Sequence, residues 1–159
     1  MTYLDVISVT DVDSWLSLGL DPDDEQAVKE VERLIKTSID WVENYTSYRL
    51  YERTETIANS RCEQSIALYP ITVVSVTYQD LSMAKYEKYV LPTKLKIKCP
   101  WNSIITLTVG YTDAADIPCP LVDACYKLIT YLYENRDMYQ AGLPTDVQIL
   151  INQYRRALI

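Results

Sequence analysis

The side chains of this 159-residue chain that could do chemistry are carboxylates, thiols and lysines, because the sequence contains no histidine. Without histidine, serine–histidine and cysteine–histidine catalysis cannot operate in their usual forms. Paired carboxylates occur at Asp23 and Asp24, and again at Asp113 and Asp116. Both pairs fall where a helix start or a turn uses aspartate, so we interpret them as structural and predict no catalytic residues.

The four cysteines, Cys62, Cys99, Cys119 and Cys125, show no CxxC spacing and have no histidine to complete a zinc site. The N-terminal segment lacks the basic and apolar regions of a secretion signal, which predicts a reducing compartment and free thiols. Cys125 falls on the apolar face of a helix, where a buried, inert thiol is expected. Three glycines are too few for a phosphate-binding loop, so we predict neither a metal nor a cofactor.

The lysines at 94, 96 and 98 alternate along one predicted strand. They either present a face to nucleic acid or form a solvated, edge-protecting face. The formal net charge of −7 makes the whole chain a poor candidate for holding DNA, since that affinity comes from neutralised phosphates. An acidic surface past which DNA slides and plain solubility both remain open. No apolar run approaches the roughly 20 residues of a membrane helix, so no membrane contact is expected.

Fourteen tyrosines and no phenylalanine form an unusual aromatic set. Tyrosine suits interfaces because its ring buries a large area while its hydroxyl stays wet. Tyr126, Tyr131, Tyr133 and Tyr139 cannot all lie on one helix face, which favours contacts with other subunits for some of them. A core that uses tyrosine in place of phenylalanine is the equal alternative.

Helical patterns at both ends must position these groups. A first short helix is predicted with Thr10 as its cap and Gly19 as its stop. A long helix follows, with Asp21 as its cap and Pro22 in its first position, and ends near residues 45–48. After the β segment, one helix starts at 118–120 and ends near 135–136. The last begins at Thr145, or one residue earlier, at Pro144.

Between the helices the period changes to that of strands, at 51–57, 65–68, 73–78 and 104–109, with a hairpin arm in 86–98 that Pro92 interrupts. The order predicts a single α+β domain spanning 1–159, predominantly α-helical, with helices in 10–48, a β segment in 50–111 and helices in 118–157.

Four stretches, in order, resemble the head–tail connector (adaptor) family of tailed bacteriophages. They are DPDD at 21–24 with the helix ending IDWVENYT at 39–46, LYPITVVSVTYQD at 68–80, ITLTVGY at 105–111 leading through Pro118 to ENRD at 134–137, and LPTDV at 143–147 with YRR at 154–156. Ser47 stands where the family usually has glycine, and residues 81–99 match least.

The resemblance implies the connector fold and a non-enzymatic virion protein at the neck, made in the host cytoplasm. It implies a ring, expected to be a dodecamer, that docks under the portal after genome packaging and extends the channel for double-stranded DNA. The partners are then further copies of the chain, the portal, and a stopper or tail protein. The expected portal contacts are Gln153, Tyr154, Arg155, Arg156, Leu158 and Ile159. The expected contacts with the next neck component are Leu81, Met83, Lys85, Tyr86 and Lys88.

Two other classes of function fit the sequence. One is a different neck component, such as a stopper or tail-completion protein, although these tend to be richer in β structure. The other is a small acidic phage regulatory protein that binds a host factor, which predicts a monomer or dimer without affinity for a portal ring.

Overall fold

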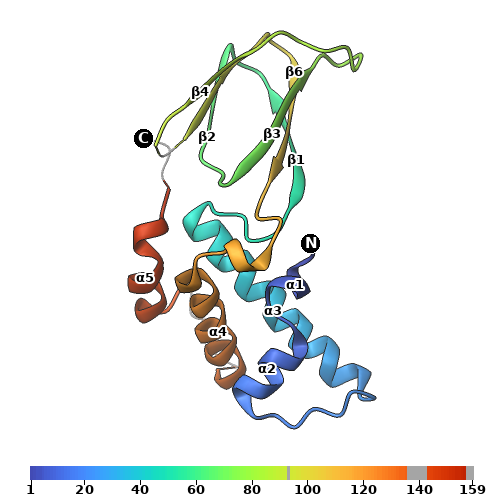
Figure 1. Cartoon of the computed structure of the whole chain (residues 1–159), viewed down its shortest axis with the longest axis vertical. Coiled ribbons are helices and arrows are strands. Elements are labelled where there is room, and N and C mark those ends of the chain that lie inside the picture. Colours follow the sequence, from blue (N-terminus) through green and yellow to red (C-terminus); the bar gives the residue numbers. More distant parts are fainter. Residues whose placement is uncertain (93, 136–142, 157–159) are drawn as a thin grey trace.

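The computed structural model describes residues 1–92, 94–135 and 143–156, and Figure 1 shows a helical half below a β half along its long axis. The helices are α1 (Tyr3–Val6), α2 (Val9–Leu16), α3 (Glu25–Thr46), α4 (Cys119–Glu134) and α5 (Thr145–Ile151), with 3-10 turns η1 (Ala114–Asp116) and η2 (Asn152–Tyr154). The long helix and both C-terminal helices were predicted. Helix α1 was not, because four residues carry too short a periodic pattern.

The sequence placed the cap of the first predicted helix wrongly. Ser8, not Thr10, caps α2: its hydroxyl accepts a hydrogen bond from the Asp11 N–H, and the Asp11 carboxylate accepts one from the Ser8 N–H. This reciprocal arrangement satisfies two backbone N–H donors at once. A helix capped at Thr10 would lack this pair of hydrogen bonds. The helix ends at Ser17 in the left-handed region, two residues before Gly19.

Helix α3 also starts later than predicted. Asp24 caps it by accepting hydrogen bonds from the N–H groups of Gln26 and Ala27. Asp21 instead closes a turn, in which its carboxylate accepts from Asp23 and its carbonyl from Asp24. An aspartate side chain serves a turn as readily as a cap, and the sequence offered three aspartates in a row of four. The helix ends at Ser47, whose φ of 65° is the left-handed conformation for which glycine is usual.

The helices share one apolar core. Its buried side chains come mainly from one face of α3 and one face of α4, including Leu34, Ile35 and Leu128, with Val147 and Ile151 from α5. Ile7 and Val12 bring the first two helices onto the same core. Fully burying such side chains contributes roughly 1.5–3 kcal/mol each, which outweighs the weak propensity of the short helices.

The β half contains two three-stranded antiparallel sheets. One has the order β1 (Arg53–Asn59), β6 (Ser103–Val109), β3 (Ile71–Thr77), and the other has β2 (Glu63–Ile66), β5 (Leu95–Lys98), β4 (Glu87–Val90). Strand β6 alternates between buried and half-buried residues, as its β-branched pattern predicts. A second core takes Val76, Ile105 and Leu107 from the first sheet, and Ile66 and Ile97 from the second, so the sheets face one another.

The predicted hairpin arm around Pro92 forms β4 and β5, with Pro92 in the loop between them, where no ladder hydrogen bond is needed. The α+β class is confirmed. The β half is inserted into the helical half through two adjacent connections, one from Ser47 to Glu52 and one from Gly110 to Pro118.

Candidate interaction surfaces

The junction between the two halves holds the C-terminal segment. The backbone N–H of Arg156 donates to the carbonyl of Thr46 at 3.0 Å, and its guanidinium donates to the carbonyl of Pro92 at 2.7 Å. The same guanidinium lies 4.5 Å from the ring centroid of Tyr69. The segment is therefore tied to the end of α3, to the β4–β5 loop and to the chain before β3.

Tyrosines fill this junction. Tyr48 packs against Tyr69 at 4.9 Å between ring centroids and against Tyr154 at 5.7 Å, edge to face. Burial raises the pKa of Tyr48 and of Tyr111 above the ordinary value, with further contributions from the neighbouring tyrosines. Of the two interpretations of the tyrosines, this group supports the internal one.

The six residues predicted to contact a portal divide into three sets. Tyr154 and Arg156 are half-buried in the junction, while Gln153 and Arg155 are exposed. The Arg155 guanidinium lies 5.2 Å from the ring centroid of Tyr45, which holds its charge at the surface. Leu158 and Ile159 lie outside the described residues.

A pocket of about 550 Å³ adjoins the C-terminal segment. Its lining is mostly apolar and aromatic, with Leu68, Ile71 and Leu95 among the apolar residues, and includes three cationic side chains. It lies where strands β3 and β4, each at the edge of its sheet, leave one side of the two-sheet core open. The cations there are Lys88, Lys94 and Arg156.

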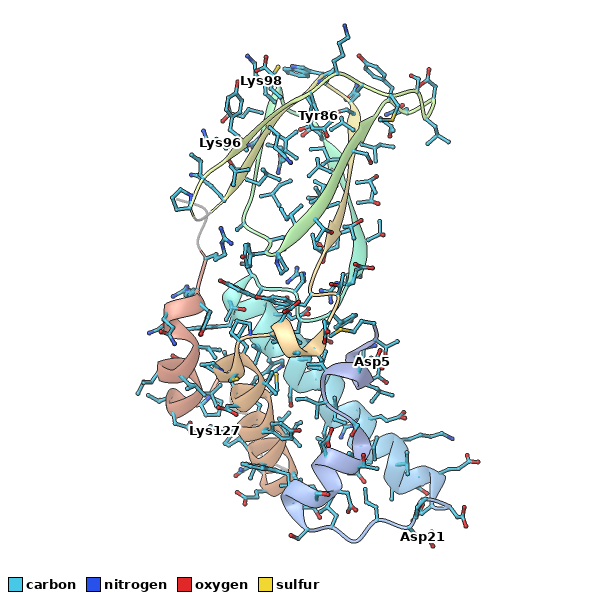
Figure 2. The ribbon with its side chains drawn as sticks, in the orientation of Figure 1. Asp5, Asp21, Tyr86, Lys96, Lys98 and Lys127 are labelled. Carbon is cyan, nitrogen blue, oxygen red and sulfur yellow. The ribbon has the colours of Figure 1, made fainter. Side chains whose placement is uncertain are left out.

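The second predicted surface lies at the far end of the β half, in the connection from β3 to β4. Leu81 and Met83 are 77% and 71% exposed, and Lys85, Tyr86 and Lys88 are exposed as well. The Tyr86 hydroxyl donates to the carbonyl of Val74 at 2.8 Å, which holds this connection along the edge of β3 (Figure 2).

Leu81 has a φ of 66°, a left-handed conformation that a leucine side chain disfavours. The turn around it is closed by hydrogen bonds from the Tyr78 N–H to Ser82 and from the Leu81 N–H to Tyr78. Leu81 thus combines a strained backbone with an exposed apolar side chain, a combination found more often at functional sites than elsewhere.

The lysine face of β5 is partly neutralised. Lys96 pairs with Glu63 at 2.6 Å and Lys98 with Glu87 at 3.8 Å, across the two neighbouring strands (Figure 2). These cross-strand pairs support the interpretation as a solvated sheet face over that as a nucleic-acid contact.

The two carboxylate pairs singled out from the sequence lie at separate turns of the chain. Asp24 and Asp113 each cap a helical turn, as the structural interpretation predicted. Cys125 is fully buried, and burial raises its pKa far above the ordinary value, as expected for an inert thiol. Within residues 1–92, 94–135 and 143–156, no group of three potential ligands could hold a metal ion. No helix in the same ranges is both long and apolar enough to cross a bilayer.

The sequence reasoning missed two exposed tryptophans. Trp101 is 66% exposed in the turn between β5 and β6, where its position between proline and asparagine was a detectable signal. Trp15 on α2 packs against Tyr126 on α4 at 5.2 Å and donates to the Thr130 hydroxyl, so Tyr126 faces another helix and not only solvent. Tyr139 lies outside the described residues.

Charge is distributed unevenly between the halves. Residues 51–110 contain seven Lys and Arg and five Asp and Glu, while the rest of the chain contains eight and seventeen. The β half is thus weakly basic and the helical half carries all of the net negative charge. Figure 2 labels Lys96 and Lys98 in the β half and Asp5 and Asp21 in the helical half, where Lys127 is labelled as well.

No protein-family model and no curated protein matches this chain. Solved structures do. A chain in "Neck of empty GTA particle computed with C6 symmetry" superposes with a TM-score of 0.80 at 18% identity, over 100% of this chain and 94% of that one. A chain in "Virion of native gene transfer agent (GTA) particle" gives 0.73 at 20% identity, over 97% and 91%. One in "Neck of native GTA particle computed with C12 symmetry" gives 0.70 at 18%, over 93% and 89%. The likeness establishes a shared fold.

Proposed function

We propose that this chain is a structural component of the neck of a tailed phage or phage-like particle, and within the neck a ring-forming head–tail connector. The observation that carries the proposal is the full-length likeness to a chain of a neck structure, with a TM-score of 0.80 over both chains. A match that spans helices and both sheets is more specific than a shared motif. The order of sequence stretches that resemble the connector family supports the same assignment.

The proposed assembly is a ring, expected to contain twelve copies. Two of the similar structures were computed with sixfold and twelvefold symmetry. A head-to-tail interface repeated by rotation closes such a ring. We propose that it docks under the portal, extends the DNA channel and joins the capsid to the tail. If acids of the helical half line the channel, DNA is repelled from the wall and passes without sequence-specific binding.

We propose the C-terminal segment as the portal contact, with Gln153 and Arg155 as its exposed members and Tyr154 and Arg156 holding it to the junction. Leu158 and Ile159 complete the proposed contact. The hydrogen bonds of Arg156 to Thr46 and Pro92 support this role because they fix the origin of the segment. A segment that is anchored where it begins loses less conformational entropy when it binds a partner.

The proposed contact with the next neck component is the connection between β3 and β4, through Leu81, Met83, Lys85 and Tyr86, together with Lys88 in β4. Two largely exposed apolar side chains beside two lysines fit an interface with an apolar centre and a polar rim. The connection with Leu81 and Met83 lies farther from the helical half than the C-terminal segment does, while Lys88 lines the pocket that adjoins that segment.

The second candidate function is another neck component, a stopper or tail-completion protein. This candidate is supported because two of the similar structures are described as necks of particles, without a position of the matching chain within the neck. In either case the proposed role is structural and not enzymatic.

The test is to mix the purified chain with the portal of the same phage and to image the product by electron microscopy. The connector proposal expects an added ring coaxial with the portal. A chain that binds a preformed portal–connector complex, and not the portal alone, would belong at another position in the neck. A monomer or dimer that binds neither would move the assignment to the regulatory class.

A further inference from the structure

Cys62 and Cys99 stand opposite one another at the end of the second sheet. The register of β2 and β5 pairs Glu63 with Lys98, so the next pair along the ladder is Cys62 with Cys99. The Cys99 N–H donates to the Cys62 carbonyl at 3.1 Å, which extends the ladder by that pair. We propose that these two thiols are a disulfide site, reduced inside the host cell and oxidised when the protein meets a disulfide-forming environment.

The geometry of an antiparallel ladder suits this bond. Directly opposite residues that share a backbone hydrogen bond have Cα atoms about 5.5 Å apart, and their side chains leave the same face of the sheet. Disulfides span Cα separations of about 4.4–6.8 Å. The bond therefore forms without a change of register and needs only a small approach of the two Cβ atoms.

Each of the two sulfurs has polar neighbours at this end of the sheet. The Asn59 amide lies 3.2 Å and the Ser103 hydroxyl 3.4 Å from the Cys99 sulfur, and the Trp101 indole N–H contacts the Cys62 sulfur. Asn59 and Ser103 are themselves buried. The cysteines at 119 and 125 belong to α4, in the helical half.

The pair combines an accessible thiol with a protected one. Cys62 is exposed and Cys99 is buried. Both line an open depression together with Lys85, Lys98 and Glu87, and the net positive charge of this lining favours the approach of an anionic disulfide such as oxidised glutathione. An accessible attacking thiol beside a second thiol is the arrangement that completes an exchange within one molecule.

The chemistry balances in two exchange steps. The Cys62 thiolate attacks one sulfur of oxidised glutathione, forming a mixed disulfide and releasing one glutathione thiolate, which takes up a proton. The Cys99 thiol then loses its proton and attacks the Cys62 sulfur, releasing the second glutathione. Two protein thiols lose two electrons and two protons, and one glutathione disulfide becomes two glutathione thiols.

Oxidation would enclose the proposed contact with the next neck component. Residues 62–99 form the covalent loop, and Leu81 and Met83 lie inside it. Closing a long loop restricts the unfolded chain and stabilises the folded one. The inference stands without the proposed function, since it rests on strand register and thiol exposure alone.

The experiment treats the purified full chain with oxidised glutathione and then counts free thiols after denaturation. Four thiols should fall to two, and the intact mass should fall by about 2 Da with no glutathione adduct. Cleavage before aspartate at Asp80, Asp113 and Asp116 separates Cys99 from the cysteines of α4. The linked peptides should be 40–79 and 80–112, and the urea midpoint should rise in the oxidised protein alone.

Two variants make the result specific. Cys62→Ser changes an exposed side chain, so it should fold, keep three thiols after treatment and show no rise in urea midpoint. Cys119→Ser, which removes the other exposed thiol, should still lose about 2 Da. A lasting glutathione adduct on Cys62 with Cys99 reduced would overturn the proposal. So would a link that joins Cys119 to another chain, or four thiols that survive treatment.

Discussion

Arg53 is the first residue of β1, and its guanidinium donates a hydrogen bond of 2.6 Å to the carboxylate of Glu43 in the last turn of α3. Glu43 is only 1% exposed, and its second oxygen accepts the Leu50 N–H at 2.8 Å. One buried carboxylate thus ties the end of the long helix to the chain leaving it and to the first strand.

Replacing Glu43 with alanine should destabilise the protein by about 3 kcal/mol, because it leaves the buried Leu50 N–H without its acceptor and removes one of the two carboxylates that pair with Arg53. Urea unfolding measures the loss. Glu52→Ala, at an exposed neighbouring position, serves as the matched control and should change the free energy by less than about 0.5 kcal/mol. Equal effects at the two positions would show that the carboxylate of Glu43 does not join the halves.

The two carboxylates at the junction predict opposite pH dependences. Partial burial acts to raise the pKa of Glu55, but hydrogen bonds and charge from Arg49 and Arg53 outweigh it and hold the pKa below its ordinary value. The folded state therefore binds this proton less tightly than the unfolded state. The stability contributed by Glu55 is present above about pH 4.5, the ordinary value, and is lost as the pH falls through the folded pKa.

For Glu43 the sign is reversed, because burial raises its pKa despite the hydrogen bonds from Arg53 and Leu50. Its proton-linked contribution is present below its ordinary pKa and is lost as the pH rises through the folded one. Urea midpoints of the unmodified chain and of Glu55→Gln, measured from pH 7 to pH 3, should converge on acidification. When the unmodified chain is compared with Glu43→Gln over the same range, its urea midpoint should rise relative to that of the variant on acidification.

Gly110 should not tolerate a side chain. Its φ is 101°, and an added Cβ would overlap the backbone carbonyl of Tyr51. Gly110→Ala should cost at least about 2 kcal/mol in thermal or urea unfolding. Gly19→Ala is the control, since Gly19 also has a positive φ but open space around it, and should cost only about 1 kcal/mol. A cost at Gly110 no larger than that at Gly19 would refute the close approach.

Leu81→Asn should separate stability from binding. Asparagine accepts the left-handed conformation better than leucine, so the free energy of unfolding should stay constant or rise by up to about 1 kcal/mol. Affinity for the next neck component should fall on the order of tenfold, because the exposed apolar side chain is lost. Ser17→Asn relieves a similar conformation on α2 and should leave binding unchanged. Unaltered capture by Leu81→Asn would remove Leu81 from the contact.

Arg155→Glu should weaken binding to the portal about tenfold at low salt, with a smaller difference at high salt, because the side chain is exposed and charged. Surface plasmon resonance against immobilised portal rings measures both. Lys36→Glu makes the same change of charge on the exposed face of α3 and should bind normally. If both variants weaken binding equally, net charge and not the C-terminal segment governs the interaction.

The sequence predicted the elements better than their ends and pairings. Local sequence is enough to recognise α3 and α4 by the spacing of their apolar residues, and β3 and β6 by their β-branched runs. The caps were missed because aspartate and serine act equally in turns, and only the fold decides that Asp24 caps while Asp21 turns. The pairing of β2 with β5 joins residues 29 to 35 positions apart, and nothing local in Glu63 or Lys98 encodes it.

The interaction surfaces were predictable only in outline. Residues 81–88 were chosen by resemblance, and their exposure agrees with a surface role. Nothing in the sequence distinguished Arg155, which is exposed, from Arg156, which packs on Tyr69 and bonds the Pro92 carbonyl. That difference arises from tertiary contacts with Tyr69, with the β4–β5 loop and with the end of α3. The charge of the helical half could have been counted from sequence once the division between the halves was known.

The chain enters and leaves the β half at one place. Arg53, at the start of β1, pairs with Val109, at the end of β6, so the β half is connected to the helical half through two neighbouring strand ends. A segment with adjacent ends can be exchanged by recombination while the scaffold that receives it keeps its fold. Within the proposed function, a lineage of particles could acquire a new tail by replacing this one cassette and retain the capsid it already had.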